Sequence, residues 1–173
     1  MIRLAAMAAL ALGLAVSAAE AASIKLETTK GEITFRLRDD VAPRHAERML
    51  TLTREGFYDG VPFHRVMKGF MAQTGDPTGT GTGGSKYPDL QAEFSRLSFT
   101  RGAVGMARAQ DPDSANSQFF ITNADATFLD GDYTVVGEVT GGMDVVDKLN
   151  AGSREANGMV PNPDRVVRAT VID

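Results

Sequence analysis

The chain has 173 residues, no cysteine and a formal net charge of −4, from 18 basic and 22 acidic residues. This length suits one domain with a single hydrophobic core, and the absence of cysteine excludes disulfide bonds. A mildly acidic chain lacks the basic surface that binds nucleic acid or anionic membranes, so we expect neither as a partner. Packing of apolar side chains must therefore provide the stability.

Residues 1–21 predict a secretory signal peptide. Arg3 precedes an apolar run over residues 4–16, and Ala19 and Ala21 stand in the arrangement of a signal-peptide cleavage site. The run is shorter than the roughly 20 residues of a membrane-spanning helix, which disfavours the alternative of a membrane anchor. We expect cleavage after Ala21, a mature domain of residues 22–173 in the bacterial periplasm, and no stable membrane association afterwards.

Strand signals dominate the mature part. Residues 24–28 and 33–38 alternate apolar and polar side chains, and Lys30-Gly31 between them is typical of a hairpin turn. Pro43 can open a helix that Gly56 ends. The remaining predicted elements are strands over residues 61–66, 104–107, 135–136 and 165–172, and a helix over residues 142–149.

The order of these elements indicates the fold class. The strands are short and separated by Gly, Pro and Asp, and they do not alternate with helices as in a parallel α/β sheet. We therefore expect a mainly β domain, either an antiparallel barrel or a sandwich, with helices added.

A long loop rich in Gly and Thr covers residues 74–90, and loops of that length in compact domains are often functional. Residues 79–84 match the glycine fingerprint of dinucleotide-binding sites. That fingerprint requires a helix directly after it, because the helix amides hold the pyrophosphate, and Pro88 would obstruct such a helix. We therefore do not expect a nucleotide site.

Arg65 is the best candidate for chemistry, because Gln73, Gln118 and large apolar side chains accompany it in two neighbouring motifs. Taken alone, Arg65 would rather indicate a surface residue whose stem covers apolar area, and it is these neighbours that favour a ligand site. His45 and His64 are the only histidines, too few for a metal site. We expect His64 to be structural and held by hydrogen bonds; the alternative is a hydrolase that uses it as a base, although no nucleophile motif is present.

The chain closely resembles the cyclophilin family of peptidyl-prolyl cis-trans isomerases, in particular its bacterial, periplasmic branch. The motifs that carry the resemblance are Phe63-His64-Arg65, Gly69-Phe70-Met71-x-Gln73-x-Gly75-Asp76, Gly81-Thr82-Gly83-Gly84, Met106-Ala107-x-Ala109, Ser117-Gln118-Phe119-Phe120-Ile121 and Phe128-Leu129-Asp130-Gly131. The resemblance implies a closed antiparallel β-barrel of eight strands capped by two α-helices, and neither a cofactor nor a metal.

The resemblance also implies the site. Arg65 and Gln73 match the catalytic positions of the family. The substrate-binding positions implied are His64, Phe70, Met71, Ala107, Arg108, Ala109, Gln118, Phe120, Phe128, Leu129 and Tyr133. Arg108 stands where Asn is usual, and we expect the change to be tolerated because the role at that position belongs to the main chain.

Two further departures concern an inhibitor. Phe128 stands where many members have Trp, and Tyr133 where many have His. The missing indole N–H removes a hydrogen-bond donor that often holds cyclosporin, so we expect weak cyclosporin binding.

The expected function is isomerisation of X–Pro peptide bonds in exported proteins, which would assist their folding. Its substrates would be proline-containing polypeptide segments, and we expect a monomer. The alternative within the same fold is a non-catalytic chaperone or adaptor that binds such segments without turning them over.

Overall fold

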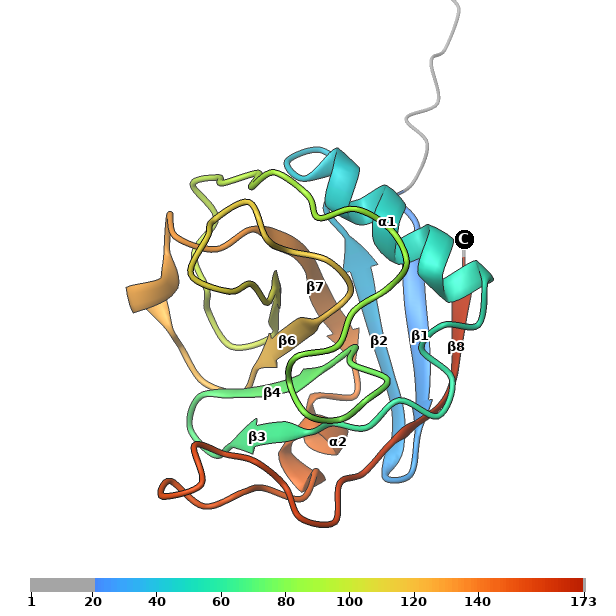
Figure 1. Cartoon of the computed structure of the whole chain (residues 1–173), viewed down its shortest axis with the longest axis vertical. Helices are drawn as coiled ribbons and strands as arrows, with labels where there is room; N and C mark the ends of the chain where they lie inside the picture. The colour runs from blue at the N-terminus through green and yellow to red at the C-terminus, as the bar shows by residue number, and fades with distance from the viewer. Residues whose placement is uncertain (1–20, 173) are drawn as a thin grey trace, which may run out of the picture.

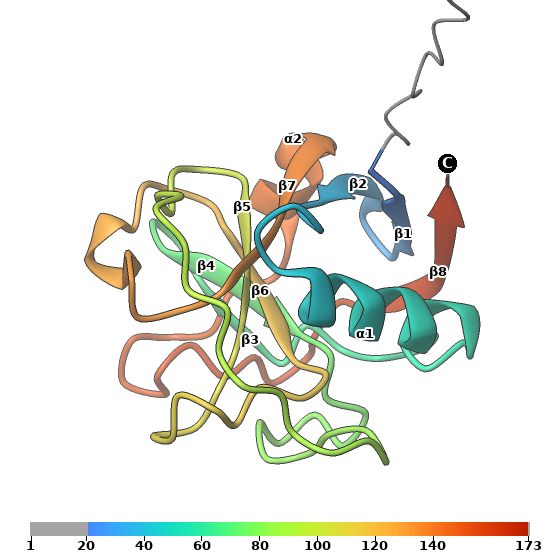
Figure 2. The ribbon, with the colours of Figure 1, turned by 90° about the horizontal axis from the view of Figure 1, so that it is seen from above.

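The computed structural model describes residues 21–172, which form one curled antiparallel sheet with two α-helices packed against it (Figures 1 and 2). The predicted signal peptide, apart from Ala21, lies outside the described residues. In chain order the elements are β1 (Ser23–Thr28), β2 (Gly31–Leu37), α1 (Pro43–Arg54), β3 (Arg65–Met67), β4 (Met71–Thr74), β5 (Ala103–Met106), β6 (Phe119–Thr122), the 3₁₀ turn η1 (Thr127–Leu129), β7 (Val135–Gly141), α2 (Met143–Lys148) and β8 (Val166–Ile172).

The hairpin of β1 and β2 follows the alternation in the sequence. Ile24 and Leu26 on β1 pair with Phe35 and Ile33 on β2, and all four side chains are fully buried. The turn between the strands needs glycine, because Gly31 has a φ of 133° and a Cβ there would lie 2.9 Å from a methyl group of Val145. The predicted hairpin is therefore confirmed.

The two helices lie at opposite ends of the long strands β1 and β2 (Figure 1). Helix α1 begins at Pro43 as expected, and the carboxylate of Glu93 accepts hydrogen bonds from the main-chain N–H groups of Arg44 and His45 in its first turn. Its buried face consists of His45, Ala46, Met49, Leu52 and Thr53. Leu50, next to Met49, is only half-buried. Helix α2 matches the second predicted helix and buries Val145 and Val146.

The closed barrel that the family resemblance implied is corrected to a curled half-barrel. The strand order is β3-β4-β6-β5-β7-β2-β1-β8, so β3 and β8 are the two edges, and no strand ladder joins them within residues 21–172. Only an isolated bridge between Pro62 and Arg165 crosses the gap. The physical reason is that β3 has three residues and its outer edge is already used: Val66 N–H donates to the carbonyl of Gly158 at 2.8 Å.

Two apolar clusters fill the interior. The larger one lies between the sheet and the helices and includes Phe35, Met49, Phe119 and Val146. The smaller one is formed by Met71, Phe99, Ala103, Phe120, Ala126, Leu129 and Val135. This second cluster reaches the surface beside β3, and the candidate site is built on it.

Candidate active site

Strand pairing brings the predicted catalytic residues together. Arg65 on β3 is directly opposite Gln73 on β4, and Gln73 is directly opposite Phe120 on β6. Residues that are directly opposite in paired strands project from the same face of a sheet, so these three side chains lie side by side. Next to them, Gly105 on β5 leaves space that the rings of Phe99 and Phe120 occupy.

The guanidinium of Arg65 is held only by neutral acceptors. Its Nε donates to the carbonyl of Asn157 at 2.9 Å, one Nη to the side-chain oxygen of Asn157 at 3.1 Å, and the other Nη to Oε1 of Gln73 at 3.3 Å. Burial lowers the pKa of Arg65 from its usual value, although a guanidinium stays charged at neutral pH. The result is an oriented cation that forms no ion pair with a carboxylate within residues 21–172.

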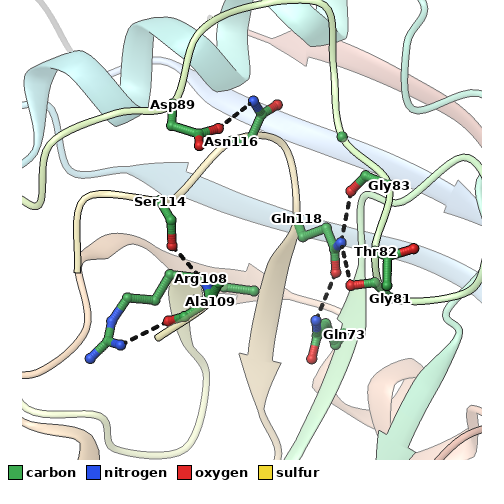
Figure 3. A pocket seen from close by; sticks show the side chains of 12 residues that line it. Gln73, Gly81, Thr82, Gly83, Asp89, Arg108, Ala109, Ser114, Asn116 and Gln118 are labelled. Carbon is green, nitrogen blue, oxygen red and sulfur yellow. Dashed lines mark hydrogen bonds between the residues drawn. The ribbon is translucent and has the colours of Figure 1, made fainter. Parts of the chain in front are cut away.

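A chain of amides connects Arg65 to the glycine-rich loop. Nε2 of Gln73 donates to Oε1 of Gln118 at 2.8 Å, and Nε2 of Gln118 donates to the carbonyls of Gly81 at 3.0 Å and Gly83 at 2.8 Å (Figure 3). Each amide both donates and accepts, so the orientation of one fixes the orientation of the next.

The arginine cavity, as we call it, has a volume of about 360 Å³. Its apolar floor is formed by Met71, Phe120 and Leu129, all buried, while the polar groups stand at the rim. It is lined by His64, Arg65, Phe70, Met71, Gln73, Thr80, Gly81, Ala107, Arg108, Phe120, Leu129, Tyr133, Asn157 and Met159. An apolar pocket with a few convergent polar groups is the usual form of a ligand site.

A second hollow, the glycine-loop cavity, adjoins the first and has a volume of about 550 Å³. It is lined by Gln73, Gly81, Thr82, Gly83, Gly84, Asp89, Ala107, Arg108, Ala109, Ser114, Asn116 and Gln118. Gln73, Gly81, Ala107 and Arg108 line both cavities, which together form one groove.

The glycine-rich loop folds around a carboxylate of its own chain. Asp76 is fully buried, and its oxygens accept hydrogen bonds from the main-chain N–H groups of Thr78, Gly81 and Gly83, at 2.8, 2.6 and 3.1 Å. Burial by itself would raise the pKa of Asp76, but a hydrogen bond from the Thr78 hydroxyl, together with these three from the main chain, holds it below its usual value. Because Asp76 occupies these amides, they do not form the phosphate cradle that the fingerprint of residues 79–84 resembles.

The structure gathers nearly all the predicted site residues in this groove. Ala109 and Gln118 line the glycine-loop cavity, and the others except Phe128 line the arginine cavity. Phe128 lies outside both cavities: its side chain is 70% exposed and its ring centroid is 5.4 Å from that of Phe70. The main-chain N–H and C=O of Arg108 make no hydrogen bond within residues 21–172, whereas the N–H groups of Ala107 and Ala109 on either side are both bonded.

Sequence reasoning missed several groove residues, of which Asn157 is the most important because it holds Arg65. Asn157 is also the only non-glycine residue with positive φ, 51°, in the described part of the chain. Its asparagine-glycine pair is a turn signal, but nothing in the sequence indicates that this turn meets a strand 92 residues away.

His64 differs from expectation. Its ring lines the arginine cavity, but it is buried and neither ring nitrogen has a hydrogen-bond partner within residues 21–172. It is therefore not held by side-chain hydrogen bonds as predicted. Burial lowers the pKa of His64, despite the nearby Asp76 carboxylate, so the ring is neutral at pH 7. A buried ring without an oriented partner argues against a hydrolytic base.

Within residues 21–172, no cluster of His, Asp and Glu could hold a metal ion. Within the same residues, no helix has the length and hydrophobicity needed to cross a membrane.

The sequence has clear relatives. The sequence model for "Cyclophilin type peptidyl-prolyl cis-trans isomerase/CLD" matches residues 23–171. A probable peptidyl-prolyl cis-trans isomerase of Brucella suis is 52% identical over 182 residues, covering 96% of this chain and 92% of that protein. A peptidyl-prolyl cis-trans isomerase of Schizosaccharomyces pombe is 37% identical over 155 residues, covering 87% of this chain and 99% of that protein.

Solved structures agree with the sequence relatives. A Cryptosporidium parvum cyclophilin, crystallised in the presence of the dipeptide Ala-Pro, superposes with a TM-score of 0.80 at 27% identity and covers 87% of this chain and 99% of that one. A cyclophilin from Hirschia baltica gives a TM-score of 0.77 at 27% identity, covering 86% of this chain and 73% of that one. The chain therefore belongs to the cyclophilin-type peptidyl-prolyl cis-trans isomerases, a family of enzymes.

Proposed function

We propose that the arginine cavity binds the ring of a substrate proline and that Arg65 stabilises the twisted X–Pro bond. Rotation of a peptide bond costs about 18–20 kcal/mol because the C–N bond has partial double-bond character, and for X–Pro it takes roughly tens to hundreds of seconds. When the bond is twisted, the prolyl nitrogen regains a lone pair. A guanidinium beside that nitrogen can donate to it in the transition state but not in the planar ground state, which is the differential binding that raises a rate.

The rest of the groove fits the same mechanism. The floor formed by Met71, Phe120 and Leu129 suits an apolar ring, and a twisted amide is less polar than a planar one. The unpaired main-chain groups of Arg108 can hydrogen-bond the chain next to the proline. Gln73, fixed by Gln118, can bind the substrate carbonyl. One side of the bond is then clamped while the other turns.

The observation that carries this proposal is the position of Arg65: a cation oriented by neutral acceptors at the rim of an apolar cavity. An acceleration of about five orders of magnitude requires about 7 kcal/mol, at about 1.4 kcal/mol for each factor of ten. Positioning the substrate and one preorganised charged donor can together provide that amount.

The test uses residues 22–173 in a protease-coupled assay with a proline peptide. We expect Arg65→Ala to fold like the wild type and to lose about 10²–10³-fold in kcat/KM. The matched control, Arg65→Lys, keeps the charge but loses the planar fork, so we expect it to recover only part of the activity. Near wild-type turnover by Arg65→Ala would contradict the role of Arg65.

A binding assay on the same variants addresses the alternative of a non-catalytic chaperone or adaptor. If Arg65 acts mainly in the transition state, Arg65→Ala should bind the proline peptide within a few-fold of wild type while its turnover falls. Equal losses of binding and turnover would favour the binding protein.

We further propose that the enzyme is exported through cleavage after Ala21, acts on exported proteins in the periplasm and assists their folding as a monomer. Cleavage there would leave one residue, Ala22, before β1 begins at Ser23, and the carbonyl of Ala22 accepts a hydrogen bond from Leu37 N–H at 2.9 Å. The intact mass of the protein recovered from a periplasmic fraction tests the processing. A mass that includes residues 1–21 would refute it.

The exposed ring of Phe128 supports our expectation of weak cyclosporin binding, because a phenyl ring offers no hydrogen-bond donor. Sub-micromolar inhibition of the wild type would contradict this expectation.

A further inference from the structure

The side chain of Arg108 is a fixed cation on the wall of the groove. Its Nε and one Nη donate to the carbonyl of Asp132 at 3.2 and 2.9 Å, and its other Nη donates to the carbonyl of Ala109 at 3.0 Å. The guanidinium carbon lies 4.5 Å from the ring centroid of Tyr133, as in cation–π pairs. A half-buried arginine side chain is thus held in one place although its main chain alone would serve the substrate.

The charge of Arg108 is not neutralised. All its hydrogen-bond partners are main-chain carbonyls, and it forms no ion pair within residues 21–172. Other arginines of the chain do form ion pairs. A guanidinium nitrogen of Arg101 lies 2.7 Å from a carboxylate oxygen of Asp147, and one of Arg44 lies 3.1 Å from a carboxylate oxygen of Glu93. The geometry also leaves one N–H of Arg108 free, because a guanidinium has five and these contacts use at most four.

The arginine cavity as a whole also has an excess of positive charge. Two guanidinium groups, Arg65 and Arg108, line it, and no Asp or Glu does. The glycine-loop cavity differs, since Asp89 lines it. In Figure 3 the Arg108 side chain points away from Gln118 and Gly83, and it rests on Tyr133, which lines only the arginine cavity. The positive charge is therefore on one side of the groove.

We infer that Arg108, seated on Tyr133, makes the enzyme prefer proline segments that carry an acidic side chain on one side of the proline. This inference rests on the proposed function, because it places the substrate along the groove. The side in question is the one away from the glycine-loop cavity, since a carboxylate there would reach the free N–H of Arg108 and a lysine would be repelled. On the opposite side of the proline, towards Asp89, the preference should be absent or reversed.

The expected size is modest because Arg108 is partly exposed to solvent. Exposed ion pairs correspond to roughly two- to five-fold at low salt, and salt screens them. We expect kcat/KM for a peptide with Glu beside the proline to exceed that for the Lys peptide by about this factor for each replaced charge, with the Gln peptide between them.

The experiment measures kcat/KM for six peptides, with Glu, Gln or Lys either directly before or directly after the proline, at low salt and at about 1 M NaCl. The proteins are residues 22–173 as wild type, Arg65→Ala, Arg108→Gln, Arg108→Lys and Arg54→Gln. Arg54 is exposed in the last turn of α1, so Arg54→Gln makes the same change in net charge away from the groove. Thermal melts show that each variant folds.

The inference predicts that the wild type prefers Glu over Lys at one of the two positions only. The preference should disappear in Arg108→Gln and in high salt. It should keep its direction in Arg108→Lys and be unchanged in Arg54→Gln. An equal preference in wild type and Arg108→Gln, or one that Arg54→Gln also removes, would overturn it. The uncharged Gln peptides distinguish a failure of this inference from a failure of the proposed function. If Arg65→Ala still turns them over at the wild-type rate, the proposed function fails; if it does not, only the role of Arg108 is in question.

Discussion

The two cavities of the groove are built by different means. In the arginine cavity, Arg65, Gln73 and Phe120 come from β3, β4 and β6, and strand pairing fixes their positions relative to one another. The glycine-loop cavity takes residues 81–84 from a loop, and three of these four are glycines, which have no side chain to contribute. Paired strands thus position the cation, whereas a loop shapes part of the surface along which a chain can lie.

This difference indicates a division of labour. A catalytic donor must be placed accurately, and residues on paired strands are held more precisely than residues on loops. Gripping a flanking chain tolerates more variation, and a loop can supply it provided that the loop is itself fixed. Here one buried carboxylate, Asp76, and one amide, Gln118, fix the loop. Substitutions of Asp76 or Gln118 therefore test the contribution of the glycine-loop cavity apart from that of the arginine cavity.

The largest effect should come from Asp76→Ala. It removes every acceptor of three loop N–H groups at a buried position, so we expect the free energy of unfolding to fall by about 3 kcal/mol in urea titrations. Because Arg65, Met71 and Phe120 stand on strands, KM should rise more than kcat falls. The matched control is Thr78→Ala, which keeps the carboxylate. A loss of kcat as large as that of Arg65→Ala would show that the two regions are not separable.

The amide chain between the regions should show coupling. We expect Gln73→Ala and Gln118→Ala each to lower kcat/KM by about ten-fold, and the double variant to lose much less than the product of the two. The reason is that removal of Gln118 already frees the amide of Gln73 to turn away from Arg65. Strictly multiplicative losses in the assay would mean that the two glutamines act independently.

A smaller effect is expected from Asn157→Gly. Glycine adopts the positive φ of this position without strain and keeps the carbonyl that accepts from Nε of Arg65, so only the side-chain acceptor is lost. We expect kcat to fall about three-fold with little change in stability, and the Nε–H resonance of Arg65 to shift in NMR spectra. An unchanged resonance together with unchanged kcat would show that the side chain of Asn157 does not orient Arg65.

The sequence predicted some elements of the fold and missed others. The elements with clear periodicity were predicted: β1 and β2 by alternation, and α1 by Pro43 and its apolar face. Strands β4 and β6 were not predicted as strands, because both are short and β6 is buried on both faces, so it shows no alternation. The open sheet also escaped prediction, since the segment that covers the edge of β3 is a loop far along the chain.

The candidate site was predicted by resemblance more than by pattern. Periodicity does not pair Arg65 with Gln73, because the register of two strands is set by contacts between them and not by either alone. Asn157 was missed for a similar reason: its contact depends on where a loop returns to β3. The sequence predicts only that arginine is tolerated at position 108, because the main chain has the role there, whereas the fixed position of its side chain on Tyr133 comes from the structure.

The smallest effect concerns pH and compares a histidine at the groove, His64, with one on the buried face of α1, His45. Both are buried, and burial lowers the pKa of each, although Glu93 opposes this at His45. The unfolded chain therefore binds protons at about pH 6.5 while the folded chain does not, so stability should decrease as pH falls from about 7 towards 5. The carboxylates Asp76 and Glu93 also have lowered pKa values, and the stability that they contribute is lost only at more acidic pH. His64→Gln should flatten the urea-unfolding profile between pH 7 and 5 without abolishing turnover. An unchanged or steeper profile would contradict the contribution of His64 to this pH dependence, and complete loss of activity would show that the reaction needs the His64 side chain.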